Sequence, residues 1–163
     1  MLMIKQPIAG VTPSSTREVT VMTEFPTLGS YAAGRLIGTL CAMRAGFGFF
    51  TLGKLLALLM IPVALPLFAF SLLPGVLTRY RVTNRRVIVQ KGLRAIDQRW
   101  VDLDRFDSID VEVLPGQKWY RAGDLIFRNG QIETFRLAGV PIPEAFRRTC
   151  LAAHRGYLAG LGR

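Results

Sequence analysis

Histidine and cysteine, the residues most used in metal and redox chemistry, are scarce in this sequence. Its 163 residues include one histidine and two cysteines. Cys41 lies in apolar sequence and Cys150 in an expected helix, so the pair makes neither a CxxC motif nor a disulfide framework, and we expect both to be reduced packing residues. His154 lies alone between Ala153 and Arg155, where a helix-end or surface role is favoured over catalysis.

Motifs of the common catalytic classes are missing as well. The serines lie in no nucleophile motif, and no Gly-rich phosphate loop of the Walker type occurs. One carboxylate-rich stretch lacks the spacing of a calcium loop and alternates with apolar residues, as the solvent-facing side of strands does. Its acidic members are Asp97, Asp102, Asp104, Asp107, Asp110 and Glu112. We therefore expect no catalytic residue, no metal site, no cofactor and no enzyme activity.

Acidic residues are few relative to basic ones. The chain has 11 Asp and Glu against 21 Lys and Arg, for a formal net charge of +10. This balance fits anionic phospholipid headgroups or nucleic acid as a partner. Nucleic acid is disfavoured because the aromatic residues are not interleaved with the basic ones along one strand surface. We expect anionic membrane lipid.

Charge is absent altogether from Leu55 to Leu77, a run of 23 residues. Such a run is long enough to cross the roughly 30 Å hydrocarbon core of a bilayer as a helix. The alternative, a buried helix of a soluble domain, is disfavoured because soluble helices rarely run this long without a polar face. Proline residues predict a kinked or broken helix, since they remove backbone hydrogen bonds. They are Pro62, Pro66 and Pro74.

A stripe of small residues precedes this run. A small residue occupies every fourth position, as in membrane helices that approach each other closely. These residues are Ser30, Gly34, Gly38, Ala42 and Gly46. The same segment contains Arg44, and a charge at the centre of a bilayer costs roughly 2.5–3.5 kcal/mol on insertion scales. A flexible Gly-rich loop is disfavoured, because the segment is too apolar for an exposed loop. Two membrane alternatives stay open: the segment crosses the bilayer against the second helix, or it lies in the interface as an amphipathic helix.

Short alternating runs follow Thr78 and predict a β-meander. The expected strands are 80–82, 86–90, 99–103, 108–113, 125–128 and 131–137, and an earlier strand covers 17–25. Asn129-Gly130 predicts a tight hairpin turn. Pro143 and Glu144 open a helix that closes the meander. Its apolar residues at helical spacing are Phe146, Cys150, Ala153 and Tyr157.

The entry to the meander, Tyr80-Arg81-Val82-Thr83-Asn84-Arg85-Arg86, resembles the strand and turn of bacterial pleckstrin-homology (PH)-like domains of small membrane proteins. Three later motifs are also similar to that family: Val101-Asp102-Leu103 followed by Ile109-Asp110-Val111, then Gly123-Asp124-Leu125, and finally Pro143-Glu144-x-Phe146. The resemblance implies a mainly β fold with a C-terminal helix, a PH-like β-barrel or sandwich with an inserted transmembrane helical hairpin. It divides the chain into a tail (1–15), a first strand (16–27), a membrane-embedded helical hairpin (28–77), the PH-like body (78–158) and a second tail (159–163).

The inserted arrangement constrains the topology. If the strand at 17–25 pairs with strands after Thr78, both lie on one side of the membrane and the chain crosses it an even number of times. Two passes, over 28–50 and 55–77, would satisfy this, with Lys54 at the far interface. Cations soon after the second run then place the body in the cytoplasm by the positive-inside rule. They are Arg79, Arg81, Arg85, Arg86, Lys91 and Arg94.

We therefore expect a non-catalytic, membrane-anchored PH-like adaptor that binds lipid headgroups or a protein partner. The headgroup candidates are Arg79, Arg81, Arg85 and Arg86 and, in a second group, Lys118, Trp119, Tyr120 and Arg121. Each lysine or arginine near an anionic surface adds about 1 kcal/mol of attraction. For the first group, plain topology determination is an alternative role. In the second, Trp119 could instead cap the core. The alternative function is a regulatory or oligomeric subunit assembled through the small-residue stripe.

Overall fold

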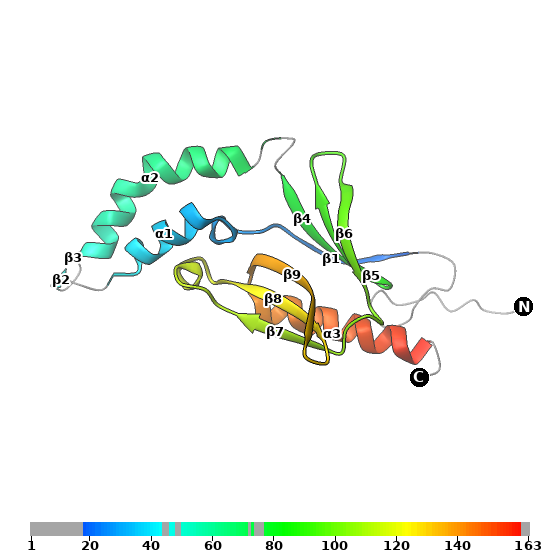
Figure 1. The fold of residues 1–163 in the computed structure, drawn as a ribbon. Coiled ribbons are helices and arrows are strands. Elements are labelled where there is room, and N and C mark those ends of the chain that lie inside the picture. Colours follow the sequence, from blue (N-terminus) through cyan, green and yellow to red (C-terminus); the bar gives the residue numbers. More distant parts are fainter. Residues whose placement is uncertain (1–17, 44–45, 48–49, 72, 74–76, 161–163) are drawn as a thin grey trace, which may run out of the picture.

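Two antiparallel sheets and a C-terminal helix make up the body of the molecule (Figure 1). The computed structural model describes residues 18–43, 46–47, 50–71, 73 and 77–160. The tail expected at 1–15, the last three residues and Pro74 lie outside the described residues. This architecture is consistent with a PH-like sandwich, as the resemblance implies.

The first sheet has the strand order β1-β4-β5-β6 and the second the order β7-β8-β9. The first contains β1 (Thr20–Glu24), β4 (Thr78–Thr83), β5 (Arg86–Lys91) and β6 (Ile96–Asp102). The second contains β7 (Ser108–Glu112), β8 (Ala122–Asn129) and β9 (Ile132–Pro141). Each strand expected from the alternating pattern is confirmed. The pattern was informative because alternate side chains of a strand point to one face, and that face must be apolar to pack on the core.

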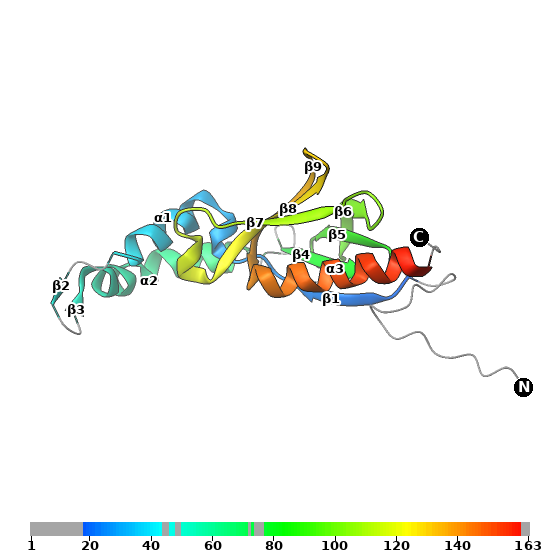
Figure 2. The ribbon, with the colours of Figure 1, turned by 90° about the horizontal axis from the view of Figure 1, so that it is seen from below.

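That core lies between the two sheets and α3 (Pro143–Gly160), which runs along them in Figure 2. The helix begins at the expected proline and buries Phe146, Cys150 and Ala153, so its predicted stripe is confirmed. Fully buried apolar residues from the sheets complete the core, among them Val82, Leu103, Ile109, Leu125, Phe127 and Leu137.

The turn at Asn129-Gly130 joins β8 to β9, where Asn129 pairs with Ile132. Gly130 has φ +60°, in the left-handed region that a tight turn requires and glycine adopts readily. The predicted hairpin is confirmed.

β1 pairs with β4 across the inserted segment. Glu24 lies opposite Tyr80, and Thr20 lies opposite Thr83. The strand before the apolar region therefore joins the sheet that follows it, which is the condition set by the inserted arrangement. The intervening segment leaves and re-enters the domain at neighbouring strands.

This inserted segment forms an arm that projects from the sheets (Figure 1). It begins at η1 (Leu28–Ser30) and continues through α1 (Ala32–Cys41), β2 (Gly46–Phe47), β3 (Phe50–Thr51) and α2 (Leu52–Ser71). The two helices pack against each other. At the start of α2 the Gly53 N–H donates to the carbonyl of Met43 (3.1 Å), and a Cβ at Gly53 would overlap that oxygen.

The first apolar segment is not a second spanning helix. α1 has ten residues, which at 1.5 Å per residue is about 15 Å, half the thickness of the hydrocarbon core. Only Gly34 and Gly38 of the small-residue stripe lie within it, because Ser30 belongs to η1, Ala42 is the C-cap and Gly46 begins β2. The expectation of one continuous stripe over 30–46 was therefore wrong, and the expected transmembrane hairpin of two full helices is not seen.

Within the described residues, α2 is the one helix long and apolar enough to cross a membrane. It keeps Pro62 and Pro66 inside a continuous helix and is bent along its length in Figure 1, as the prolines predicted. Its apolar side chains are exposed: Leu58, Leu59 and Leu65 each show about two thirds of their surface (67%, 65% and 62%).

Candidate functional site

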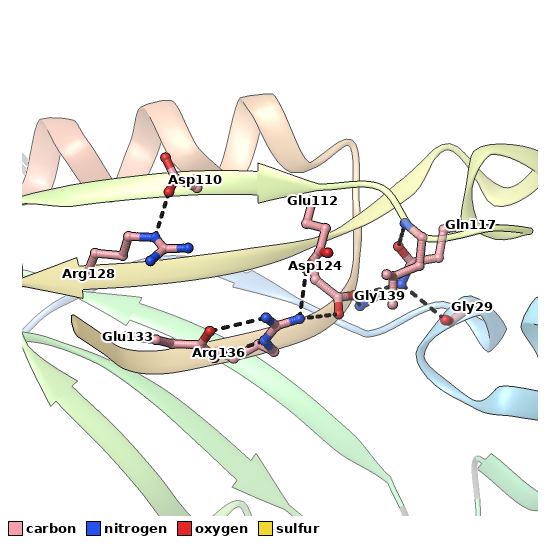
Figure 3. A network of polar contacts seen from close by, with 10 residues as sticks. Gly29, Asp110, Glu112, Gln117, Asp124, Arg128, Glu133, Arg136 and Gly139 are labelled. Carbon is pink, nitrogen blue, oxygen red and sulfur yellow. Dashed lines mark hydrogen bonds and ion pairs between the residues drawn. The ribbon is translucent and has the colours of Figure 1, made fainter. Parts of the chain in front are cut away.

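A buried polar junction holds the arm on the second sheet (Figure 3). Its centre is Asp124 on β8, only 3% exposed. One carboxylate oxygen, Oδ1, accepts hydrogen bonds from Gln117 Nε2 (2.6 Å) and from the Gly139 N–H (2.9 Å). Gln117 is fully buried, and its Nε2 also donates to the carbonyl of Gly29 in η1 (3.2 Å). The junction thus links β8, β9 and the base of the arm.

Arg136 on β9 adds a cation to this junction. Its Nη1 lies 3.4 Å from Asp124 Oδ2 and 2.9 Å from Glu112, and its Nε lies 2.9 Å from Glu133. The three carboxylates offset one guanidinium, so Arg136 is a structural cation whose charge is largely neutralised. A buried carboxylate such as Asp124 needs this compensation, because an unpaired charge is costly to bury.

The arm also packs on the loop that contains η2 (Gln117–Tyr120). The Tyr120 hydroxyl donates to the carbonyl of Gly34 (2.9 Å). A Cβ at Gly38 would overlap the carbonyl oxygen of Gly116, and a Cβ at Gly116 would overlap that of Arg35. The structure therefore brings together two groups predicted separately. The small residues of α1 allow this loop, rather than a second membrane helix, to approach.

The neighbours of Tyr120 in this loop face solvent. Lys118, Trp119 and Arg121 are exposed, and Trp119 shows 46% of its surface. Trp119 therefore does not cap the core, the alternative raised by the sequence. The loop next to α1 thus presents two cations and an indole, the residue types favoured at the headgroup level of a membrane.

The four arginines expected to form one basic patch are spread along the β4–β5 hairpin. Arg79 lies near the α2 end, whereas Arg85 and Arg86 lie at the opposite turn, about 20 Å away for six extended residues. Arg79 Nη2 donates to the carbonyls of Gly92 and Leu93, so it stabilises the β5–β6 turn. These contacts give the group structural roles alongside any attraction to lipid.

Two further arginines of that group also bind within the chain. Arg81 Nε donates to Thr20 Oγ1 (2.7 Å). Arg86 forms two hydrogen bonds with Glu18 (2.9 and 3.0 Å) and lies over the Trp100 ring, 5.6 Å from its centre. The guanidinium of Arg86 therefore joins the segment before β1 to the first sheet.

Replacing Glu18 with glutamine is expected to lower stability at pH 7 by about 1 kcal/mol. The hydrogen bond from Arg86 lowers the pKa of the Glu18 carboxyl. The ionised carboxylate thus stabilises the fold above its unfolded pKa, near 4.3, and this contribution is lost as the pH falls through the lowered folded value. Thermal unfolding of the full chain in detergent should show a wild-type advantage at neutral pH that vanishes in acid, with Glu24→Gln as the control. An advantage that persists in acid would contradict this account.

A polar cavity of about 460 Å³ opens between the two sheets near the α2 end. Basic side chains from three strands line it: Lys91 on β5, Arg99 on β6 and Arg136 on β9. Tyr80 forms part of its wall, with its hydroxyl donating to the carbonyl of Ala138 (2.8 Å), and burial raises the pKa of that hydroxyl. Tyr80 is therefore a fixed, neutral part of the wall.

An apolar cavity of about the same volume adjoins the first. It lies between the end of α2 and the segment that follows β1, and Thr78 lines both cavities. Its other lining residues are Phe25, Pro26, Tyr31, Phe68, Ser71 and Leu77. A cationic cavity and an apolar cavity thus lie side by side at the base of the membrane helix candidate.

Groups suited to metal or catalytic chemistry do not converge in the described part of the chain. No three His, Cys, Asp or Glu side chains there lie close enough to hold a metal ion. The acidic stretch instead divides into separate contacts, such as Asp110 with Arg128 (2.7 Å) and Asp107 with the Gly130 N–H (2.8 Å). His154 is half-buried, with Nδ1 on the carbonyl of Leu103.

Sequence reasoning missed the residues that line the polar cavity and hold the junction. Asp124 was noted only as part of a fold-forming Gly-Asp-Leu motif, and Gln117 carried no signal. Arg99 and Arg136 lie in strands whose polar and apolar residues alternate. That alternation predicts which side chains are exposed, but not which residues of different strands meet. Lys91 was counted only toward topology.

Comparison with known protein families agrees with this architecture. Residues 35–154 match the model of the bacterial PH domain, which is well over half of the chain. Neither the curated proteins nor the solved structures contain a significant match. PH-like domains are generally non-catalytic binding modules. The matched range runs from α1 through both sheets into α3, and the chain therefore belongs to the bacterial PH domain family.

Proposed function

We propose that this protein is a membrane-anchored binding module whose arm inserts into the bilayer and holds the PH domain at the cytoplasmic face. The observation that carries the proposal is α2. Its apolar side chains are exposed, and only 6% of its most apolar window is buried by the rest of the chain. A helix whose apolar side chains are exposed in this way needs an apolar environment that the domain does not supply.

The pairing of β1 with β4 supports an arm that enters and leaves the membrane on one side. Because these strands share a sheet, an odd number of crossings would separate them. The ten residues of α1 are too short to cross alone, so we infer that the whole hairpin of α1, β2, β3 and α2 enters from one face. Cations after α2 favour the cytoplasmic face by the positive-inside rule.

The proposed ligand is anionic membrane lipid. Two groups of exposed cations lie near the arm. Lys91 ends β5 and Arg94 follows it, whereas Lys118 lies in η2 and Arg121 follows that turn. Both are better placed for headgroups than Arg85 and Arg86, which lie at the far turn of the hairpin. Assembly through the small-residue stripe has less support, because Gly34 and Gly38 are covered by the chain's own loops.

Replacing both Leu59 and Leu65 with aspartate is expected to release the protein from membranes. An aspartate at the centre of a membrane helix costs roughly 2.5–3.5 kcal/mol of insertion free energy. The measurement is the fraction of full-length protein that stays with the membrane pellet after alkaline carbonate extraction. We expect wild type in the pellet and the double variant in the supernatant.

The matched control is Leu93→Asp, a change of an equally exposed leucine (66%) in the β5–β6 turn. This variant should stay in the pellet. Extraction of the wild-type protein, or retention of the double variant, would mean that α2 is not the anchor.

A further inference from the structure

The two cavities at the base of α2 adjoin each other and differ in chemistry. The polar one is lined by Lys91, Arg99 and Arg136, and the apolar one by side chains such as Phe68 and Leu77. Thr78, the first residue of β4, lines both. A ligand that fills them together must have a polar end and an apolar end.

The polar cavity favours an anion. No acidic residue lines it. In the described part of the chain, neither Lys91 nor Arg99 has a carboxylate within salt-bridge distance, and the Arg99 guanidinium lies over the Phe135 ring, 5.6 Å from its centre. Arg136 is already paired with three carboxylates that lie outside the lining, Glu112, Asp124 and Glu133, so Lys91 and Arg99 are the cations of the lining that an anion would meet. Two uncompensated cations from neighbouring strands suit a phosphate group.

The apolar cavity favours a hydrocarbon chain. Its lining contains no charged side chain, and its volume lies within the range of roughly 300–1,000 Å³ that is typical of ligand pockets. Phe68 and Ser71 belong to the last turn of α2, the helix proposed to lie in the bilayer. A chain in this cavity therefore lies beside the membrane helix, and a lipid can reach it from the bilayer.

We propose that the two cavities bind one anionic phospholipid molecule. Its phosphate contacts Lys91 and Arg99, and the upper part of an acyl chain lies between Phe25, Phe68 and Leu77. The site differs from a diffuse headgroup surface because it selects for both charge and a tail. This inference rests on the proposed function, since the lipid enters from the bilayer that holds α2.

The test is retention of phosphatidylglycerol by the full-length protein. Protein reconstituted in nanodiscs of mixed phosphatidylglycerol and phosphatidylcholine is transferred to detergent, and bound lipid is counted by native mass spectrometry during dilution. We expect wild type to keep one phosphatidylglycerol in preference to phosphatidylcholine. Arg99→Gln, which removes the phosphate contact, and Ser71→Phe, which fills the apolar cavity, should each weaken retention about tenfold, or about 1.4 kcal/mol.

Two variants serve as matched controls. Arg105→Gln removes an exposed arginine outside the cavity, and Val63→Phe adds a ring to an exposed face of α2 (54%). Both should retain lipid as wild type does, and melting curves in detergent establish that all four variants are folded. Glycerol 3-phosphate and inorganic phosphate, added as competitors, should not displace the lipid, because they lack the chain.

Equal retention by all variants would overturn the inference, and so would an equal loss of lipid in the control variants. Displacement of the lipid by inorganic phosphate would also overturn it, because it would indicate a phosphate site without a tail. Carbonate extraction separates this failure from a failure of the proposed function. If the protein resists extraction but shows no selective retention, the lipid site is wrong and the anchoring proposal stands. If wild type is extracted, the anchoring proposal itself is wrong.

Discussion

Replacing Asp124 with alanine is expected to lower the free energy of unfolding by roughly 3–5 kcal/mol, because the change breaks a buried charged network. The substitution leaves Gln117 Nε2 and the Gly139 N–H without the oxygen that now accepts from both. It also removes one of the carboxylates that offset Arg136. Unsatisfied buried donors carry their full desolvation cost, so the losses accumulate at one place. Thermal or denaturant unfolding of the full chain in detergent measures the effect.

Asp110→Ala is the matched control for this prediction. Asp110 pairs with Arg128 at 2.7 Å on the same sheet, but its side chain is 56% exposed. An exposed ion pair contributes about 0–1 kcal/mol, so this variant should unfold close to wild type. Similar losses in the two variants would show that burial of the Asp124 network is not what stabilises the junction. The loss of stability in Asp124→Asn should lie between those of Asp124→Ala and Asp110→Ala, since asparagine keeps the shape of the side chain but not its charge.

Replacing Gly38 with leucine is expected to destabilise the contact between α1 and the η2 loop by about 3 kcal/mol, the upper part of the range for overpacked sites. The Cβ alone would overlap the backbone carbonyl of Gly116, which no rotamer change can relieve. Separation of the two segments would also break the hydrogen bond from Tyr120 to Gly34. The measurement is the rate of limited proteolysis at the η2 loop, together with the melting temperature.

For Gly38→Ala, two effects predict opposite changes in stability. Helix propensity alone predicts that alanine stabilises a helix interior by about 1 kcal/mol relative to glycine, whereas the overlap with Gly116 predicts a loss. Ala33→Leu, on the exposed side of α1, controls for added bulk and should leave both readouts unchanged. A stabilised Gly38→Ala variant would mean that the loop can move away from α1 at little cost.

Local patterns were sufficient to predict much of this fold. Alternation of apolar residues located the strands, Asn129-Gly130 located a turn, and Pro143 located the start of α3, because each is set by the backbone preferences of adjacent residues. The uninterrupted apolar run identified α2 for the same reason. The resemblance to PH-like domains came from such fold-forming residues, and the family match agrees with it.

The small-residue stripe shows where local pattern stops being sufficient. A four-residue spacing of small side chains predicts close approach but does not identify the approaching partner. The partner is the η2 loop, more than 70 residues later in the chain, and α1 ends at Cys41, before the arm reverses between β2 and β3. Similarly, no local rule predicts the contacts of the arginines in the β4–β5 hairpin. Arg79 binds the carbonyl of Gly92 at one end, whereas Arg86 binds Glu18 at the other.

By itself, the sequence determined the strands and helix of the PH domain, the apolar anchor candidate and the positive charge, because these depend on neighbours along the chain. Only the tertiary structure decided which side chains meet. Asp124, Gln117 and Gly29 form one junction, and Lys91 and Arg99 line one cavity beside Phe68 and Leu77, because strand pairing and the inserted arm bring distant residues together. Such contacts depend on register, twist and loop packing, which are properties of the whole fold.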